Sequence, residues 1–513
     1  MTTLWRTLAA VVLWLGGGVA LAAAAPLAPD EKQALVAELC SGPADQLSAM
    51  TRIVEAGVAD DREWAAGLLT SLRGGSFVCA GADSPLVPSI VLQRQLATAT
   101  AQLDLLSPDV VLRRSAAAQI DRAFQTLNPA IVKRALAQES DPSVKQTLLL
   151  ALAKRDLGSA DLAEQQRALA VIAESPSEAS RTLLANFLET GGTTLNPDLA
   201  SAAGLALQSV DRWLQMGHWS SVLFSGLSYA GVLLVTALGL SIVFGLLGVI
   251  NLAHGEFIMI GAYATYLVEQ LLRAHAPGLF NAYIFIAIPV AFVVCALCGM
   301  VLEVCVIRHL YHRPLETLLA TWAVSIALVK AVQLGFGPQN VEFITPSFLN
   351  GGMQVFAGFF VTYNRLFAIA LALLIFAATH ALIRRTRFGL LVRATTQRRD
   401  TARSLGVAAE RIDRLAFGLG AGLAGLAGVV LTQIASVNPS MGTSFVIDAF
   451  MVVVLGGAGS LVGTAVASLA LGEINQFIEP VYGAVTAKVA VLVLIVLIIQ
   501  RRPQGLFALK TRV

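Results

Sequence analysis

Charged residues are scarce in this sequence. Asp, Glu, Lys and Arg make up 13% of its 513 residues, against 56% hydrophobic residues. Soluble globular domains carry about 25% charged residues, and disordered chains are more polar still. The scarcity of charge therefore excludes a soluble enzyme and a disordered protein, and it indicates a membrane protein with a soluble portion attached. The net charge of only +3 gives no reason to expect nucleic-acid binding.

Cysteine is also rare, because the chain contains only five, and this excludes a disulfide-rich scaffold. Cys40 and Cys79 lie in the soluble portion and could form one disulfide if that portion is exported. Cys295, Cys298 and Cys305 lie in an apolar helix with no second Cys pair or nearby histidine. We interpret these three as packing residues and expect no metal site.

Enzyme motifs are missing as well. A phosphate-binding loop requires a Gly-Lys dipeptide, and the sequence contains none. H-E-x-x-H, G-x-S-x-G and zinc-finger spacings are also absent. We therefore expect no catalytic residues, no bound cofactor and no ATPase activity in this chain.

The N-terminus has the features of an export signal. Arg6 precedes an apolar run over residues 8–21, and the alanines of 22–25 supply an A-x-A cleavage site. We predict a signal peptide over 1–25, with an uncleaved first membrane helix as the alternative. Residues 26–216 carry mixed charge and no run long enough to span a bilayer, which predicts an exported helical domain.

Capping signals punctuate this helical domain. Four pairs place an N-cap residue before a proline, and each is predicted to begin a helix: Ser107-Pro108, Asn128-Pro129, Asp141-Pro142 and Ser175-Pro176. The predicted helix after Asp141 is amphipathic. Its apolar face comprises Val144, Leu148, Leu149 and Leu152, while Lys145, Lys154 and Arg155 are expected outside. Stacked hairpins of the HEAT type and an ordinary helical bundle both remain open.

Residues 217–513 read as a polytopic membrane domain, so the predicted fold class is all-α. Trp213 and Trp219 mark its arrival at the bilayer interface. The predicted membrane helices cover 222–247, 257–272, 282–307, 317–335, 359–382, 415–434 and 484–499. A further apolar segment, 445–471, is interrupted by glycines 456, 457 and 459. This segment either enters the membrane and returns, or packs closely through its small residues.

An arginine-rich segment interrupts the apolar half of the chain. Residues 384–414 contain nine arginines, so the positive-inside rule places the segment in the cytoplasm. If the N-terminus is exported, the five predicted membrane helices before this segment also bring it to the cytoplasmic side. The basic C-terminus should also be cytoplasmic, which requires an odd number of crossings.

Polar residues within the membrane segments are candidates for a substrate pathway, because such groups are costly to bury. The candidates are Asn251, His254, Glu256, Thr321, Trp322, Gln333, Asp448, Gly456 and Gly457. Glu303, Ser325, Lys330, Glu473 and Lys488 are weaker ones. The alternative roles are anchoring a turn, snorkelling to the interface, or bonding to the residue's own backbone.

Five motifs in order resemble the permease subunits of ABC importers of the branched-chain amino acid type, and in particular their urea permease branch. They are GLSIVFGLLGVINLAHGEFIMIGAY from Gly239, RPLETLLATWAVSIAL from Arg313, RTRFGLLVRATTQRRDTARSLGV from Arg385, FMVVVLGGAGSLVGT from Phe450, and QRRPQGLFALK from Gln500. The second and last motifs and the long exported extension favour the urea branch.

The resemblance implies an inner-membrane subunit of a heteromeric importer. A second permease, cytoplasmic ATPases that bind ATP-Mg, and a periplasmic substrate-binding protein would be its partners. The resemblance also implies that a coupling helix docks into an ATPase, with Arg393, Arg398, Arg399, Asp400 and Gly406 as the candidate residues. A branched-chain amino acid or short-chain amide permease is the alternative within the class. A stand-alone channel or secondary transporter and a membrane-anchored helical scaffold are alternatives outside it.

Overall fold

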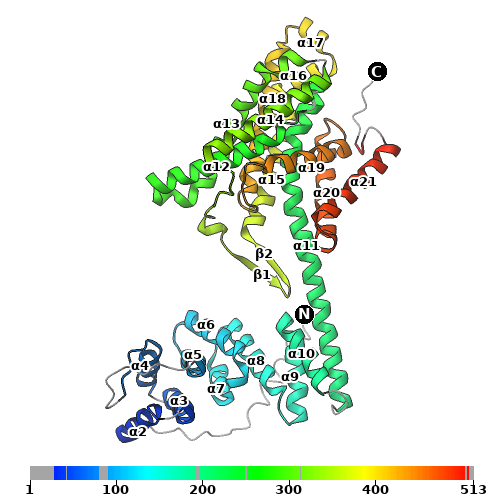
Figure 1. Ribbon diagram of the computed structural model, residues 1–513. Coiled ribbons are helices and arrows are strands. Elements are labelled where there is room, and N and C mark those ends of the chain that lie inside the picture. Colours follow the sequence, from blue (N-terminus) through cyan, green and yellow to red (C-terminus); the bar gives the residue numbers. More distant parts are fainter. Residues whose placement is uncertain are drawn as a thin grey trace. The chain divides into compact units, whose positions relative to one another are not determined.

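The computed structural model describes residues 28–41, 43–59, 61–79, 90–191, 196–248, 251–311, 313–502 and 505–507. The predicted signal peptide lies outside these residues. The chain divides into unit 1, Met1–Leu214, and unit 2, Gln215–Val513. Helices dominate both units, and the only strands among the described residues form one short hairpin (Figure 1).

The described helices of unit 1 have 10 to 17 residues, and most of them follow one another after short connections. They are α2 (Pro29–Leu39), α3 (Pro43–Ala59), α4 (Arg62–Arg73), α5 (Ile90–Asp104), α6 (Val110–Arg122), α7 (Pro129–Gln138), α8 (Pro142–Asp156), α9 (Leu162–Glu174) and α10 (Glu178–Gly191). A 3-10 turn, η1 (Phe124–Thr126), precedes α7.

The hydrophobic residues of unit 1 form three cores that follow one another along the chain. The first joins α2 to α5 around Ile53 and Leu69, the second joins α5 to α8 around Ile120 and Leu148, and the third begins in α8 and centres on Ile172. A bundle would share one core among all its helices, whereas stacked hairpins bury each layer against its neighbours. The sequential cores are those of a stack.

Two of the four predicted helix starts are confirmed. The side chain of Asn128 accepts from the amide of Ala130, and Asp141 caps α8 in the same way. The predictions at Ser107 and Ser175 are wrong. In both places the cap lies two residues later, at Asp109 and Ser177, because a second polar residue there reaches the first free amides of the helix.

The apolar face of α8 differs from the predicted one at two positions. Leu149 is exposed, whereas Lys154, expected outside, is buried. The Nζ atom of Lys154 lies 2.7 and 2.8 Å from the two carboxylate oxygens of Asp121 on α6. A buried ammonium is tolerated when a carboxylate pairs with it, and sequence periodicity does not register such a partner.

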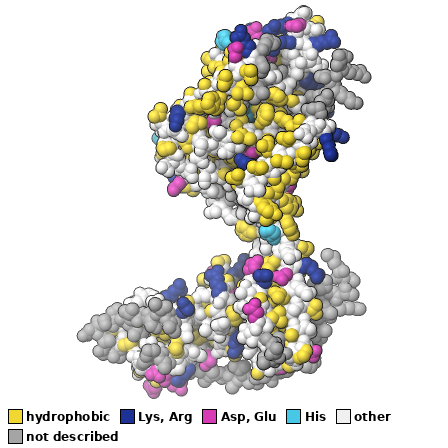
Figure 2. All heavy atoms as spheres, turned by 45° about the vertical axis from the view of Figure 1, so that its right-hand side comes forward, with side chains coloured by type: hydrophobic (Ala, Val, Ile, Leu, Met, Phe, Trp, Pro, Cys, Tyr) yellow, Lys and Arg dark blue, Asp and Glu magenta, His cyan; other side chains and the backbone are white. Residues whose placement is uncertain are grey.

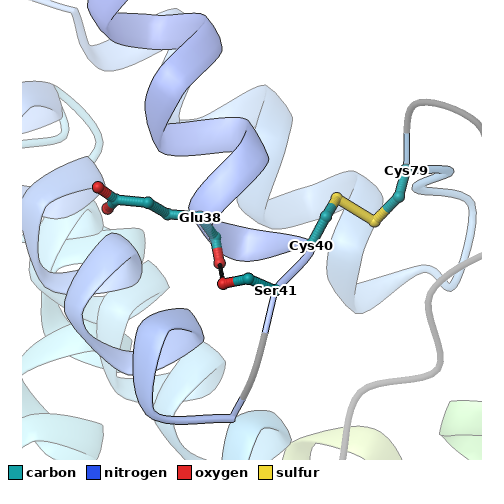
Figure 3. The surroundings of a disulfide bond; sticks show 4 residues. All are labelled: Glu38, Cys40, Ser41 and Cys79. Carbon is teal, nitrogen blue, oxygen red and sulfur yellow. Dashed lines mark hydrogen bonds between the residues drawn. A yellow bond between two sulfur atoms is a disulfide. The ribbon is translucent and has the colours of Figure 1, made fainter.

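A disulfide joins Cys40, at the end of α2, to Cys79, beyond α4 (Figure 3). Their Cα atoms lie 5.8 Å apart. Beside it, the hydroxyl of Ser41 donates to the carbonyl of Glu38 and closes the last turn of α2. The bond closes a loop of the chain that contains α3 and α4, whose residues Ile53 and Leu69 belong to the first core.

The helix predicted over 222–247 is much longer, because α11 runs from Pro197 to Leu247. No proline interrupts this stretch, and Leu199, Ala203 and Val210 pack into the third core of unit 1. Tertiary packing therefore extends the helix through residues that hydropathy assigns to the soluble part.

Unit 2 contains the later part of α11 and the described helices that follow it. They are α12 (His254–His275), α13 (Tyr283–Cys305), α14 (Pro314–Phe336), α15 (Tyr363–Arg385), α16 (Arg387–Gln397), α17 (Arg399–Ser404), α18 (Ala409–Leu431), α19 (Met441–Gly456), α20 (Leu461–Tyr482) and α21 (Ala484–Arg501). Short 3-10 turns are η3 (Pro277–Ala282), η4 (Ile307–Leu310) and η5 (Ser347–Leu349). Seven candidate membrane spans occur in the described residues. The all-α, polytopic architecture is confirmed.

One predicted membrane helix begins four residues too early, since residues 359–362 belong to a strand. Strand β1 (Gly352–Phe356) pairs antiparallel with β2 (Phe359–Thr362), and Gly358 between them has φ 74°. β-branched and aromatic residues in this stretch suit a hairpin as well as a helix, and only the glycine marks the turn.

Helices α12, α13 and α18 form the centre of unit 2. Small residues bring their backbones together: a Cβ added at Gly261 would collide with the backbone of Gly425, and one added at Gly428 with Ile258. Close backbone approach is the usual way for helices to pack inside a bilayer. The outer surface is hydrophobic in Figure 2, while Lys and Arg gather at the end where α16 and α17 lie.

The glycines of segment 445–471 form a turn between two helices. Gly457 and Gly459 have φ 96° and 80°, and Gly456 at the end of α19 lies against Gly463 of α20. Residues 459–462 line the same cavity as residues of α16 and α17. The turn therefore lies beside the arginine-rich segment rather than at the middle of the membrane domain.

Candidate functional site

Polar side chains from three helices meet at the first turn of α12. The Oε1 atom of Glu256 accepts a hydrogen bond of 2.8 Å from the hydroxyl of Ser325 on α14 and a longer one, 3.4 Å, from Thr443 on α19. Glu256 has no exposed surface. Backbones pack tightly around it, since Gly255 of α12 approaches Gly442 of α19 too closely for any side chain.

The turn before α12 adds further polar groups. The Oδ1 atom of Asn251 accepts from the amide of Ala253, and the hydroxyl of Thr321 on α14 accepts from the amide of Leu252. On the other side, the Nε2 atom of His254 lies 3.1 Å from the carbonyl of Thr236 on α11. Four predicted pathway residues thus lie around one helix end. We call Thr236, Asn251, His254, Glu256, Thr321, Ser325 and Thr443 the polar cluster.

The polar cluster leaves hydrogen-bonding capacity unused. Asn251 Nδ2, His254 Nδ1 and Glu256 Oε2 are buried without a hydrogen-bond partner among the described residues. No residue in the described part of the chain forms an ion pair with Glu256. The arrangement can therefore offer both a donor and an acceptor to a small polar molecule or to water, without a cation to answer an anionic group.

The remaining pathway candidates lie elsewhere. Trp322 is 55% exposed on the outer side of α14, and Gln333 accepts from Lys330 near the end of that helix. Gly456 and Gly457 serve helix packing and the turn described above. Hydropathy places all of these in the membrane but does not show which side of a helix faces the protein.

Asp448 belongs to a second buried group. Its Oδ2 atom accepts from the hydroxyl of Tyr229 on α11 at 2.9 Å and lies 3.4 Å from the Nζ atom of Lys488 on α21. Asp448 thus has a cation and a hydroxyl donor on one oxygen, while its Oδ1 atom is buried without a hydrogen-bond partner among the described residues. A carboxylate that is already paired and hydrogen-bonded holds helices together, and we interpret this group as structural.

The candidate coupling residues divide into two kinds. Arg393, Arg398 and Asp400 are exposed, and Gly406 has φ 84° where the chain leaves α17. Arg399 instead makes an ion pair and hydrogen bond with Asp413 of α18, whose side chain is only 5% exposed. Sequence reasoning grouped Arg399 with the docking residues because composition does not reveal an internal partner.

Arg399 also contacts the segment between η4 and α14. Its guanidinium lies 5.4 Å from the ring centroid of Tyr311, whose hydroxyl donates to Glu303 at the end of α13. Burial, followed by the nearby Asp413 and Glu303, raises the pKa of Tyr311 well above its usual range, so the hydroxyl remains a donor. We call Arg399, Asp413, Tyr311 and Glu303 the anchor, because it attaches α17 to α13 and α18.

The sequence alone did not identify several residues of the polar cluster and of the anchor, nor one further buried acid. Thr236 and Thr443 carried no signal beyond their type, and Tyr311 and Asp413 stand outside any motif with a known role. Glu269 was detectable, because it is an acid inside a predicted membrane helix. It is fully buried and lies 3.8 Å from Arg273 one turn later.

Apolar helices around a buried polar cluster, with an arginine-rich segment at one end, are the architecture of a polytopic membrane protein with a polar site inside its helices. The family model described as "Branched-chain amino acid transport system / permease component" matches residues 222–500. The chain belongs to this family of ABC permeases, which replaces the stand-alone channel, secondary transporter and scaffold alternatives. No solved structure matches the chain.

Named relatives agree with this family. The chain is 30% identical over 300 residues to the high-affinity branched-chain amino acid transport system permease protein BraD of Pseudomonas aeruginosa, covering 56% of this chain and 95% of the relative. LivH of Escherichia coli is 30% identical over 302 residues, covering 57% and 96%. LivM of the same organism is 27% identical over 304 residues, covering 54% and 67%. These relatives are permeases and not enzymes.

Proposed function

We propose that this chain is the membrane-spanning subunit of an importer that carries urea across the bacterial inner membrane by ATP-driven alternating access. Cytoplasmic ATPases, a second permease subunit and a periplasmic substrate-binding protein complete the importer. The proposal adds a substrate, an orientation and partners to the family membership.

The chemistry of the polar cluster carries the choice of urea. Urea is neutral, and it needs acceptors for its N–H groups and a donor for its oxygen. Glu256 Oε2 is an unused acceptor and Asn251 Nδ2 an unused donor. An amino acid would also present a carboxylate, and no described residue of the cluster supplies a cation for it.

A branched-chain amino acid is the second candidate, and the names of BraD, LivH and LivM favour it. Hydrophobic side chains surround the cluster, which suits an aliphatic substrate. Short-chain amides share the chemistry of urea and form a third group to test.

The orientation follows from charge. Within the described residues, the seven candidate spans together with α12 and α19 would give nine crossings, an odd number. With the arginine-rich segment and the C-terminus in the cytoplasm, unit 1 is then periplasmic. The α16–α17 region faces the ATPases, and its exposed residue Asp400, which does not line the cavity beside this region, is available for docking.

The deciding experiment measures uptake of radiolabelled urea in cells that carry or lack the gene, with leucine as competitor. We expect ATP-dependent urea uptake that disappears with the gene and is insensitive to leucine. Loss of leucine uptake with unchanged urea uptake would make the amino acid reading correct and the urea proposal wrong.

A variant tests the polar cluster directly. Glu256→Gln keeps the size of the side chain but replaces a carboxylate oxygen by an amide donor. We expect urea uptake to fall by about tenfold or more, the effect of losing roughly 1.4 kcal/mol of interaction. Glu316→Gln, on the exposed surface of α14, is the matched control. Normal uptake by Glu256→Gln would remove the cluster from the pathway.

A further inference from the structure

A cavity of about 960 Å³ lies between α11, the α15–α17 region and the turn that joins α19 to α20. It is separate from the polar cluster, because none of the cluster residues line it. Its walls come from segments far apart in the sequence: residues of α11, the end of α15, and the arginine-rich segment. A space of this size accommodates a ligand much larger than urea or an amino acid.

Three arginines line this basic cavity: Arg384, Arg393 and Arg398. The described residues that line it include no aspartate or glutamate, and no ion pair to these arginines occurs within the described part of the chain. The Nε atom of Arg393 donates to the carbonyl of Gly389, which leaves its remaining donors available. Three unpaired guanidinium groups around one space make a strongly positive environment.

Two buried polar atoms also line the cavity without a partner. Ser241 is fully buried on α11, and its hydroxyl has no hydrogen-bond partner among the described residues; the same holds for the Nδ1 atom of His380 on α15. Buried polar groups in folded proteins are normally satisfied, so each such group calls for a ligand or water. Hydroxyl and guanidinium donors without a carboxylate select an anion with several oxygens.

Apolar side chains also line the cavity. They belong to Ile242, Ile383, Leu405, Leu461 and Val462. A free inorganic anion would leave this surface in contact with water, whereas an amphipathic molecule would cover it. The described residues that line the cavity also lack an acid to answer the ammonium of an amino acid, so an amino acid does not fit its chemistry.

The position of the cavity favours an amphipathic anion over a free inorganic one. Arg384 lies in the last turn of α15, and His380 and Ile383 precede it within the same candidate span. The cavity thus extends from the end of a membrane helix into its apolar part. Arginines at the cytoplasmic end of membrane helices lie at the level of the anionic lipid headgroups.

We propose that the basic cavity binds the phosphate headgroup of an anionic phospholipid, with Arg384, Arg393 and Arg398 on the phosphate, Ser241 donating to it, and the apolar side chains of the cavity against an acyl chain. The lipid fills the space between α11, α15 and the arginine-rich segment. This site is independent of the identity of the transported substrate.

The test uses the full chain purified in mild detergent and compares the phospholipids that remain bound, measured by mass spectrometry. Arg384→Gln/Arg393→Gln/Arg398→Gln should retain about tenfold less phosphatidylglycerol or cardiolipin than the wild type, since each interfacial arginine contributes to anionic-lipid binding. The control, Arg385→Gln/Arg387→Gln/Arg411→Gln, removes the same charge from exposed arginines that do not line the cavity and should retain the wild-type amount. Equal lipid in the two triple variants would overturn the proposal.

Two further measurements keep the result decisive. If the triple variant does not fold, Ser241→Ala removes one buried donor without changing charge, and it should still lower retention of anionic lipid selectively. Delipidated protein is then offered nanodiscs of phosphatidylcholine with or without phosphatidylglycerol, and separately inorganic phosphate. Binding of phosphate without preference for phosphatidylglycerol would show that a free anion, and not a lipid, occupies the cavity, and would overturn the proposal.

Discussion

The ion pair between Arg399 and Asp413 predicts a specific loss and recovery of stability. Arg399→Gln leaves the Asp413 carboxylate, whose side chain is 5% exposed, without its partner. Breaking a buried pair from one side costs about 3–5 kcal/mol. Because 30% of the Arg399 side chain is exposed, we take the lower limit, about 3 kcal/mol, and expect the lost contact with Tyr311 to add up to about 1 kcal/mol.

The assay is unfolding of the purified chain in detergent by titration with denaturant. Asp413→Asn alone should also be destabilising, since it leaves the guanidinium of Arg399 partly buried. The double variant Arg399→Gln/Asp413→Asn carries two neutral amides and should recover at least half of the summed loss, because neither charge then lacks its partner. Arg411→Gln, exposed on the same helix as Asp413, is the control and should stay within about 0.5 kcal/mol of the wild type.

Additivity would refute the reasoning. If the double variant loses the sum of the two single losses, the side chains are energetically independent and the anchor does not exist as described. The same variants separate two roles for Arg399. A double variant that still binds the ATPases identifies Arg399 as an internal residue, and loss of binding despite recovered stability returns it to the docking surface.

Three further predictions concern other parts of the chain. Ser325→Ala should lower the free energy of unfolding by about 1–3 kcal/mol, because the buried Glu256 loses its shorter hydrogen bond. The control Ser404→Ala, in exposed α17, should have little effect. Unfolding in detergent measures both variants. Cys40→Ser/Cys79→Ser should destabilise unit 1 by about 4 kcal/mol, the chain-entropy value for residues 39 apart, and Cys298→Ser, an exposed free cysteine, should not; thermal melting compares them. Acid should destabilise unit 1. The hydrogen bond from Arg114, together with those from the amides of Val144 and Ser143, lowers the pKa of Asp141 below its ordinary value of 3.8. The stability that the ionised Asp141 carboxylate contributes is therefore present above pH 3.8 and is lost as the pH falls through the lower pKa of the folded state. If the melting temperature stays constant as the pH is lowered below 3.8, or if it decreases by the same amount in Arg114→Gln, this last prediction is wrong.

Composition and hydropathy were sufficient for the architecture. Scarce charge, long apolar runs and the arginine-rich segment predict a polytopic membrane domain, and the helices of unit 2 follow the predicted order. Their limits were less predictable. The early start of α11 depends on packing in unit 1, and the hairpin before α15 depends on Gly358, which the hydropathy of the stretch conceals.

The polar cluster was only partly accessible from sequence. Asn251, His254 and Glu256 stand close together in one motif, so their common location could be predicted. Thr236 and Thr443 reach the same place from helices far away in the sequence, and contact across helices leaves no mark in a single sequence. Asp448 and Arg399 each have a partner inside the fold, Tyr229 and Asp413, which a single sequence does not reveal.

The hydrogen bonds at the end of α19 have a consequence for biosynthesis. The carbonyls of Leu455 and Gly456 accept from the amides of Leu506 and Phe507, which lie beyond α20 and α21. A helix end normally finds its partners in the residues that follow it directly. Here the ribosome must complete both later helices before the end of α19 is satisfied, so residues translated after α21 complete the turn beside the arginine-rich segment.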